Sequence, residues 1–205
     1  VELLCVNCMG HRENKTDPCP HCGFCEADYQ APLYHLPLRT ILNGKYMVGR
    51  SIGEGGFGIT YIGWDLNLEM RLAIKEYYPA GYVSRTSGSS YSVTPFTGEA
   101  GRLFTEGRDK FIREARNLAK FDSLPGIVRV KDFFMENGTA YIVMEYLDGI
   151  TLKEYLKRQG GRLPVGQVLS LMEPVIHSLV QVHRAGLIHR DISPDNIMIL
   201  RDGTM

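Results

Sequence analysis

The residues that most clearly suggest chemistry are Asp191 and Asn196, in the stretch His189-Arg190-Asp191-Ile192-Ser193-Pro194-Asp195-Asn196. At this spacing the carboxylate of Asp191 can accept the proton of an attacking hydroxyl group, and the amide oxygen of Asn196 can hold a magnesium ion. Three of these residue types often meet by chance, so the stretch alone is weak evidence. Its weight comes from the motifs that precede it in the chain.

A glycine-rich stretch lies upstream, Gly53-Glu54-Gly55-Gly56-Phe57-Gly58. Glycines let a backbone close on phosphate oxygens without side-chain clash, but the same pattern occurs in dinucleotide-binding folds, where a helix follows directly. Here Ile59-Thr60-Tyr61-Ile62 follows, so we expect the loop to join two strands. Lys75 ends a third apolar strand, Leu72-Ala73-Ile74-Lys75. Alone it would be interpreted as a solvated lysine, but beside the glycine stretch it is a candidate phosphate ligand.

Residues 105–121 have the 3.6-residue apolar spacing of a helix, which Glu114 interrupts. A carboxylate on an apolar face needs a cation, and we predict an ion pair with Lys75, formed directly or after the helix swings in. Pairing with Arg113 or Arg116 is the alternative.

Residues 79–103 are rich in Ser, Thr and Gly and are expected to form a long surface loop.

Further elements follow toward Asp191. Residues 127–134 and 139–145 read as two strands joined by a hairpin at Asn137-Gly138, a strong turn signal. Thr151-Leu152-Lys153-Glu154 is a capping box that opens a short helix. A long apolar helix is expected over 163–183, followed by a strand-like run at 197–200.

All five cysteines lie in the first 25 residues, and Cys5, Cys8, Cys19 and Cys22 form two C-x-x-C pairs. Such pairs suit tetrahedral Zn²⁺, and a module of this size needs metal to fold because it buries little core. Unpaired thiols or disulfides are the alternative, and Cys25 is expected to be a spare. Residues 29–45, with Pro32 and Pro37, are interpreted as a linker.

The composition limits the function classes. Hydrophobic residues make up 44% and charged residues 22%, which is typical of a globular protein rather than a disordered one. Lys+Arg and Asp+Glu are both 23, so no net charge points to nucleic acid or to a membrane surface. No run is apolar and long enough to span a bilayer, and no signal peptide is visible. We therefore expect a cytoplasmic location, with a membrane anchor further along the protein left open.

The ordered motifs carry a family resemblance. The glycine stretch, Leu72-Ala73-Ile74-Lys75, Glu114, Val143-Met144-Glu145-Tyr146-Leu147 and His189-Arg190-Asp191 together resemble the protein kinases, most closely bacterial serine/threonine kinases with an N-terminal zinc ribbon. The resemblance implies an α+β protein-kinase-like fold, with a five-stranded antiparallel small lobe and the start of a helical large lobe. The expected division is a zinc ribbon over 1–28, a linker over 29–45, the small lobe over 46–147 and part of the large lobe over 148–205.

The resemblance also implies roles for individual residues. Asp191, Lys75 and Glu114 would be catalytic, and Asn196 would bind Mg²⁺. The ATP-binding residues would be Ile52, Gly53, Glu54, Gly55, Gly56, Phe57, Gly58, Thr60, Ala73, Lys75, Met144, Glu145, Leu147 and Met198. The implied reaction is transfer of the γ-phosphate of ATP to Ser/Thr hydroxyl groups of proteins, with Mg²⁺ as cofactor and Zn²⁺ in the ribbon. The ribbon is also a candidate binding site for a partner. A small-molecule phosphotransferase and a non-catalytic scaffold that works through its zinc ribbon are the alternatives.

Two departures from the family pattern affect these expectations. Ser193 stands where serine/threonine kinases usually have Lys, and Thr60 replaces the usual Val over adenine. Val1 is not Met, and no Asp-Phe-Gly follows Asn196 before Met205, so we treat the sequence as a fragment. We expect residues 1–205 alone not to catalyse phosphoryl transfer at a useful rate, because the Asp-Phe-Gly carboxylate is a strong Mg²⁺ ligand.

Overall fold

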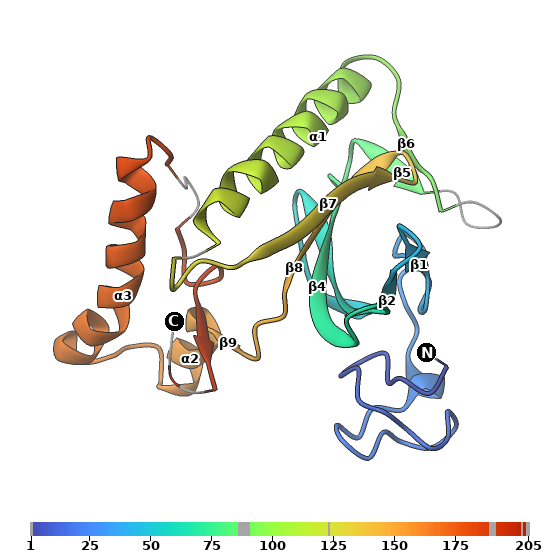
Figure 1. Ribbon diagram of the computed structural model, residues 1–205, viewed down its shortest axis with the longest axis horizontal. Helices are drawn as coiled ribbons and strands as arrows, with labels where there is room; N and C mark the ends of the chain where they lie inside the picture. The colour runs from blue at the N-terminus through green and yellow to red at the C-terminus, as the bar shows by residue number, and fades with distance from the viewer. Residues whose placement is uncertain (1, 86–90, 123, 189–191, 202, 204–205) are drawn as a thin grey trace. The chain divides into compact units, whose positions relative to one another are not determined.

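The computed structural model describes residues 2–85, 91–122, 124–188, 192–201 and 203 (Figure 1). The chain forms two compact units, Val1–Ala119 with Val130–Tyr146 and Lys120–Arg129 with Leu147–Met205. The elements assigned mainly to the first unit are η1 (Glu26–Asp28), β1 (Ile41–Leu42), β2 (Tyr46–Gly55), β3 (Gly58–Asp65), β4 (Met70–Tyr77), β5 (Val83–Arg85), β6 (Val93–Pro95), α1 (Glu99–Leu118), β7 (Val130–Glu136) and β8 (Thr139–Glu145).

The centre of the first unit is an antiparallel sheet with the strand order β1-β2-β3-β4-β8-β7. Five of these strands confirm the expected small-lobe sheet. The sixth, β1, was not expected: Asn43 and Gly44 adopt positive φ angles of 48° and 66°, which turns the chain back so that β1 pairs with the start of β2. At the β7–β8 hairpin, Asn137 and Gly138 have φ angles of 51° and 73°, as the predicted tight turn requires.

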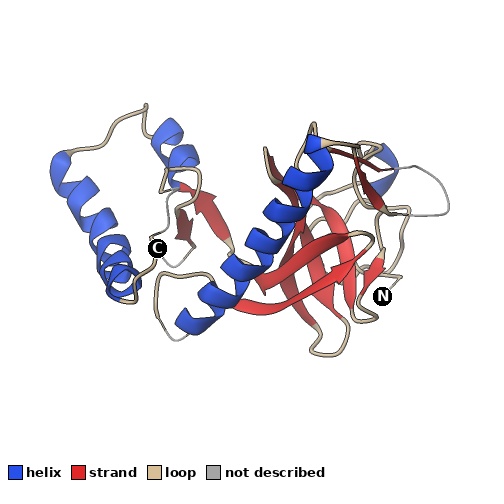
Figure 2. Cartoon of the chain, turned by 90° about the horizontal axis from the view of Figure 1, so that it is seen from above, coloured by secondary structure: helices blue, strands red, loops and turns tan. Residues whose placement is uncertain are grey.

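Helix α1 lies across the sheet and packs against β7 and β8 (Figure 2). Its buried residues are Phe104, Phe111 and Ala115. The helix begins at Glu99, well before the predicted start at 105, because Phe104 packs on Tyr77 with ring centroids 5.4 Å apart. Gly101 and Gly107 lower the helix propensity of this first half, which is why the sequence pattern did not show it.

The predicted long loop over 79–103 contains a two-stranded hairpin, β5–β6, so that expectation was wrong in part. Val83 and Val93 are buried against the main core, and Arg85 forms an ion pair with the fully buried Glu76. Alternation of one apolar and one polar residue over so few positions is too short a signal to separate a strand from a loop.

The second unit holds η2 in part (Ala119–Phe121), β9 (Gly149–Thr151), α2 (Leu152–Arg158), α3 (Val165–Arg184) and β10 (Met198–Leu200). The predicted capping box is confirmed at Thr151, whose hydroxyl oxygen accepts a hydrogen bond from the backbone N–H of Glu154 at 3.1 Å. The predicted long helix is confirmed as α3, and the predicted strand-like run is β10, which pairs with β9. Among the described residues, no helix is both long and apolar enough to cross a membrane.

Candidate nucleotide site and cysteine centre

The glycine stretch connects β2 to β3, as the sequence predicted. A Cβ atom added at Gly53, Gly55 or Gly56 would meet no atom within 4 Å, so these three residues leave a bare backbone. Gly58 is required for a different reason, because a Cβ there would lie 2.3 Å from the carbonyl oxygen of Glu76 on β4. A strand–turn–strand loop with an open backbone is suited to close approach of phosphate oxygens.

One face of the sheet gathers several of the predicted nucleotide-binding residues. Thr60 lies directly opposite Lys75, and Ala73 lies opposite Met144. Directly opposed residues in an antiparallel pair project to the same face, and residues two apart along a strand do so too. The Lys75 side chain is exposed and Ala73 is small, so this face combines an exposed ammonium group with room for a flat ring. The register shifts at Ile52, whose side chain is 41% exposed.

The structure does not bring Lys75 and Glu114 together, so the predicted ion pair is absent from the described part of the chain. Glu114 instead lies within 3.8 Å of Lys110, one turn earlier on α1, and its side chain is 58% exposed. The reason is helical geometry: Glu114 precedes the buried Ala115 by one residue, about 100° around the helix, and lies on the flank of the apolar face. An exposed carboxylate needs no partner cation, so the expectation that Glu114 interrupts the apolar face was wrong, whereas its pairing with Lys75 after a movement of the helix stays a prediction.

The catalytic candidate Asp191, with His189 and Arg190, lies outside the described residues. The segment that follows it is anchored within the second unit. The backbone N–H groups of Leu152 and Lys153 donate to the carbonyl oxygens of Ile197 and Pro194 at 2.8 and 2.9 Å. The Lys153 ammonium also pairs with Asp195 at 2.9 Å. The start of α2 therefore fixes the backbone on both sides of Asn196.

The other residues predicted to bind nucleotide are distributed over both units. Glu145 ends β8 in the first unit, and Leu147 follows it as the first residue of the adjoining part of the second unit. Met198 begins β10 and lies opposite Thr151 of β9. Each of these three residues is half-buried.

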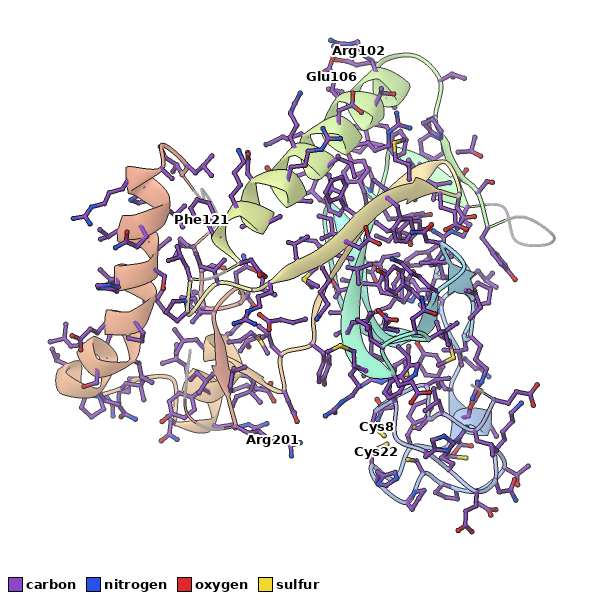
Figure 3. The ribbon with its side chains drawn as sticks, viewed as in Figure 1. Cys8, Cys22, Arg102, Glu106, Phe121 and Arg201 are labelled. Carbon is purple, nitrogen blue, oxygen red and sulfur yellow. The ribbon has the colours of Figure 1, made fainter. Side chains whose placement is uncertain are left out.

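The cysteines at the N-terminus form a metal-binding geometry, and Figure 3 shows Cys8 and Cys22 next to each other. The Sγ atoms of Cys5, Cys8, Cys19 and Cys22 lie within 4.8 Å of one another. The Cys5–Cys22 and Cys8–Cys19 Sγ distances are both 3.7 Å. A tetrahedral ion with Zn–S bonds of about 2.3 Å requires S–S separations of about 3.8 Å. The four sulfur atoms therefore fit Zn²⁺, and Cys25 is not among the residues of this group.

Burial raises the pKa of the Cys5 and Cys8 thiols, and backbone hydrogen bonds oppose that rise, whereas the pKa of Cys22 is lowered. The backbone N–H of Gly10 donates to Cys8 Sγ at 3.4 Å, and Asn7 Nδ2 donates to Cys22 Sγ at 3.3 Å. Burial raises the pKa of the Cys22 thiol, but the hydrogen bonds from Asn7 and the Phe24 backbone outweigh it and lower that pKa to about 7. Gly10 is also needed for space, since a Cβ there would lie 2.6 Å from the His21 ring.

The cysteine module packs on the sheet rather than standing apart from it. Leu4 and Met9 form a buried cluster with Met47 and Ile62, and Tyr146 packs against that cluster from the end of the first unit. The backbone N–H of Arg50 on β2 donates to the carbonyl oxygen of Val6 at 2.9 Å. The segment expected as a linker is also packed, with Leu36 and Leu42 in the main core.

Two polar groupings near the site were missed by sequence reasoning. Glu76, the residue after Lys75, is fully buried and pairs with Arg85, and it accepts hydrogen bonds from Tyr61 at 3.0 Å and Tyr141 at 2.8 Å. Burial raises the pKa of the Glu76 carboxyl group, and the Arg85 guanidinium opposes that rise. The second grouping joins Tyr34 and His35 to Glu54 in the glycine stretch. The sequence did contain a signal for the Glu76–Arg85 grouping, because Glu76 is an acidic residue on the buried side of an apolar strand.

Comparison with known proteins defines the family. Residues 46–205 match the family described as "Protein kinase domain", so this chain belongs to the protein kinases. The chain is 32% identical over 158 residues to the serine/threonine-protein kinase PrkC of Bacillus subtilis, covering 77% of this chain and 21% of that protein. It is 33% identical over 168 residues to the serine/threonine-protein kinase PknL of Mycobacterium tuberculosis, covering 82% of this chain and 37% of that protein.

A solved structure described as the apo form of PpkA-294 has the same fold. It matches with a TM-score of 0.76 and 37% sequence identity over 83% of this chain and 59% of that one. The predicted protein-kinase fold is therefore confirmed, and the names of the relatives do not favour a small-molecule phosphotransferase. The chain spans about a fifth to about a third of the length of the two curated relatives given above.

Proposed function

We propose that the protein is an ATP-dependent protein kinase that phosphorylates Ser and Thr hydroxyl groups of other proteins. The observation that carries the proposal is the sheet face with Thr60, Ala73 and the exposed Lys75, next to a glycine loop whose backbone is bare. Membership of the protein kinase family and the names of the relatives support the same reaction.

The roles proposed for the first unit follow from its chemistry. The glycine stretch from Gly53 to Gly58 covers the phosphates with backbone N–H groups, and the Lys75 ammonium balances the charge of the α- and β-phosphates. Apolar contacts from Ile52, Thr60, Ala73 and Met144 enclose the adenine. Backbone groups of Glu145 and Leu147 bind the adenine edge.

The remaining roles concern the transferred group. Asp191 accepts the proton of the attacking hydroxyl, and the Asn196 amide oxygen holds Mg²⁺. When bound, ATP supplies the phosphoryl group and Mg²⁺ neutralises its charge. We propose that Glu114 pairs with Lys75 only after α1 moves, which makes the conformation described here an inactive one in which Glu114 pairs with Lys110.

We also propose that Cys5, Cys8, Cys19 and Cys22 bind one structural Zn²⁺ ion. The four sulfur atoms match the size of a tetrahedral site, and hydrogen bonds from Gly10 and Asn7 stabilise two of the sulfurs. Free thiols together with a need for ATP suit the cytoplasm, which we propose as the location of this part of the protein.

The test is a transfer assay with the full-length protein, radiolabelled Mg-ATP and a mixture of protein substrates. The expected result is acid-stable label on phosphoserine and phosphothreonine after hydrolysis of the substrate proteins. Label confined to phosphotyrosine, or transfer only to added small-molecule alcohols, would contradict the proposed substrate class.

A further inference from the structure

We propose that Tyr34 and His35, which precede the kinase domain, are positioning residues that hold the glycine loop in place for ATP. The inference rests on the proposed function and names two residues that act on its nucleotide site only through Glu54. The Tyr34 hydroxyl group donates to both carboxylate oxygens of Glu54, at 2.9 and 3.2 Å. His35 Nε2 lies 3.2 Å from Glu54 Oε2. Glu54 lies between Gly53 and Gly55, so these contacts reach the loop itself.

The two residues are themselves anchored. His35 is 6% exposed and lies edge-on to the rings of Tyr34 and Tyr61, with centroid separations of 4.7 and 5.9 Å. The neighbouring backbone N–H of Leu36 donates to the Tyr61 hydroxyl oxygen at 3.1 Å. Tyr34 stacks on Tyr78 with centroids 5.8 Å apart. A partner fixed by packing loses little conformational entropy when it holds a loop.

The register of the strands places this contact on the far side of the loop from the proposed nucleotide. Glu54 lies opposite Ile59, and Ile59 lies opposite the buried Glu76. These residues share one face, whereas Thr60 and Lys75 project from the other. The Tyr34–His35 contact therefore restrains the loop without occupying the space above Lys75. The backbone N–H of Tyr78 also donates to the carbonyl oxygen of Phe57 at 3.2 Å, which fixes the loop where it enters β3.

A glycine-rich loop loses conformational entropy when it closes on a ligand, and this loss weakens binding. A loop that is already held in position loses less. Removing the Tyr34 hydroxyl should therefore weaken ATP binding while leaving the transfer step nearly unchanged. For one hydrogen bond to a partly exposed carboxylate we expect an increase in KM for ATP of about threefold to tenfold.

The experiment compares Tyr34→Phe, Glu54→Ala and the double variant in the full-length protein, with Tyr29→Phe as the matched control. Tyr29 lies in the same segment, and no hydrogen bond of its hydroxyl to the glycine loop is present among the described residues. The expected result is a raised KM with little change in kcat for both single variants, and no further rise in the double variant. Tyr29→Phe should match the wild type.

Hydrogen exchange of the backbone amides of residues 53–58 without nucleotide provides the second measurement. We expect faster exchange in Tyr34→Phe and in Glu54→Ala than in Tyr29→Phe. Unchanged exchange, a KM that is unchanged or lowered, or effects of the two single variants that multiply in the double variant would overturn the inference. Faster exchange in a protein whose wild type does not bind Mg-ATP would instead overturn the proposed function.

Discussion

Lys75 and Glu76 are adjacent residues of β4 with opposite surroundings, because successive side chains of a strand project to opposite faces. The Lys75 ammonium is exposed on the face proposed for the nucleotide. Glu76 is fully buried on the other face, where Arg85, Tyr61 and Tyr141 surround its carboxylate. Substitutions at the two positions should therefore have separate effects, one on chemistry and one on stability.

Lys75→Met should reduce phosphoryl transfer by about 10²- to 10³-fold, because a cation aimed at developing phosphate charge is lost. The free energy of unfolding should change by no more than about 0.5 kcal/mol, since the side chain is exposed and forms no ion pair in the described part of the chain. Transfer rates and urea unfolding of the same preparations check both statements. A variant that transfers phosphate at the wild-type rate would contradict the role given to Lys75.

Arg85→Met should destabilise the protein by about 3–5 kcal/mol, because it leaves the Glu76 carboxylate buried without its cation. The Arg85 side chain is 2% exposed in this pair. Arg102→Met is the matched control, since Arg102 is 65% exposed and pairs with Glu106 on the surface of α1 (Figure 3). Its effect should be below about 1 kcal/mol. Equal losses of stability in urea unfolding would contradict the importance of the buried pair.

At the scale of elements, the strongest local signals gave reliable predictions. The Asn137-Gly138 turn, the Thr151 capping box and the strands on either side of the glycine stretch all depend on residues close in sequence. The β5–β6 hairpin was missed because its three-residue strands are too short to give a pattern, and it is held by burial of Val83 and Val93 and by the ion pair of Arg85 with Glu76. The sequence pattern contains no local trace of such a pair.

Helix α1 contains Gly107, and its substitution by Ala should lower stability rather than raise it. Gly→Ala in a helix normally stabilises by about 1 kcal/mol. A Cβ at Gly107 would lie 2.0 Å from Tyr77 Oη, and Tyr77 is buried between Phe104 and Phe111. We therefore expect Gly107→Ala to lower the melting temperature, and Tyr77→Phe to restore part of the loss. Gly166→Ala in α3, where no atom lies within 4 Å, is the control and should not destabilise.

The cysteine module should depend on its metal. We expect one Zn²⁺ per chain in protein purified without chelator, and we expect Cys19→Ser to lose most of it and to lower the melting temperature. Cys25→Ser is the matched control and should retain the metal, because Cys25 is outside the group of four sulfur atoms. Elemental analysis gives the zinc content. A wild-type content below about a tenth of an ion per chain would contradict a structural zinc site.

At the scale of the whole molecule, the order of motifs along the chain was enough to predict the kinase fold, which the family match confirmed. The ion pair of Lys75 with Glu114 was not predictable in the same way. The two residues are separated in sequence by the β5–β6 hairpin and most of α1, so no local pattern indicates the distance between them. The contacts of Tyr34 and His35 with Glu54 were likewise not predictable from the sequence, since single side chains far apart in the chain leave no periodic signal.

The central claim is that this protein transfers phosphate from ATP with Asp191 as the proton acceptor. The most direct measurement compares the full-length wild-type protein with Asp191→Asn for transfer of radiolabelled phosphate from Mg-ATP to Ser/Thr protein substrates, alongside binding of Mg-ATP to both. We predict measurable transfer by the wild type and a reduction of about 10²- to 10⁴-fold in Asp191→Asn, with ATP affinity retained. Equal transfer by the two proteins, or no transfer by a folded wild type that binds Mg-ATP, would contradict the account.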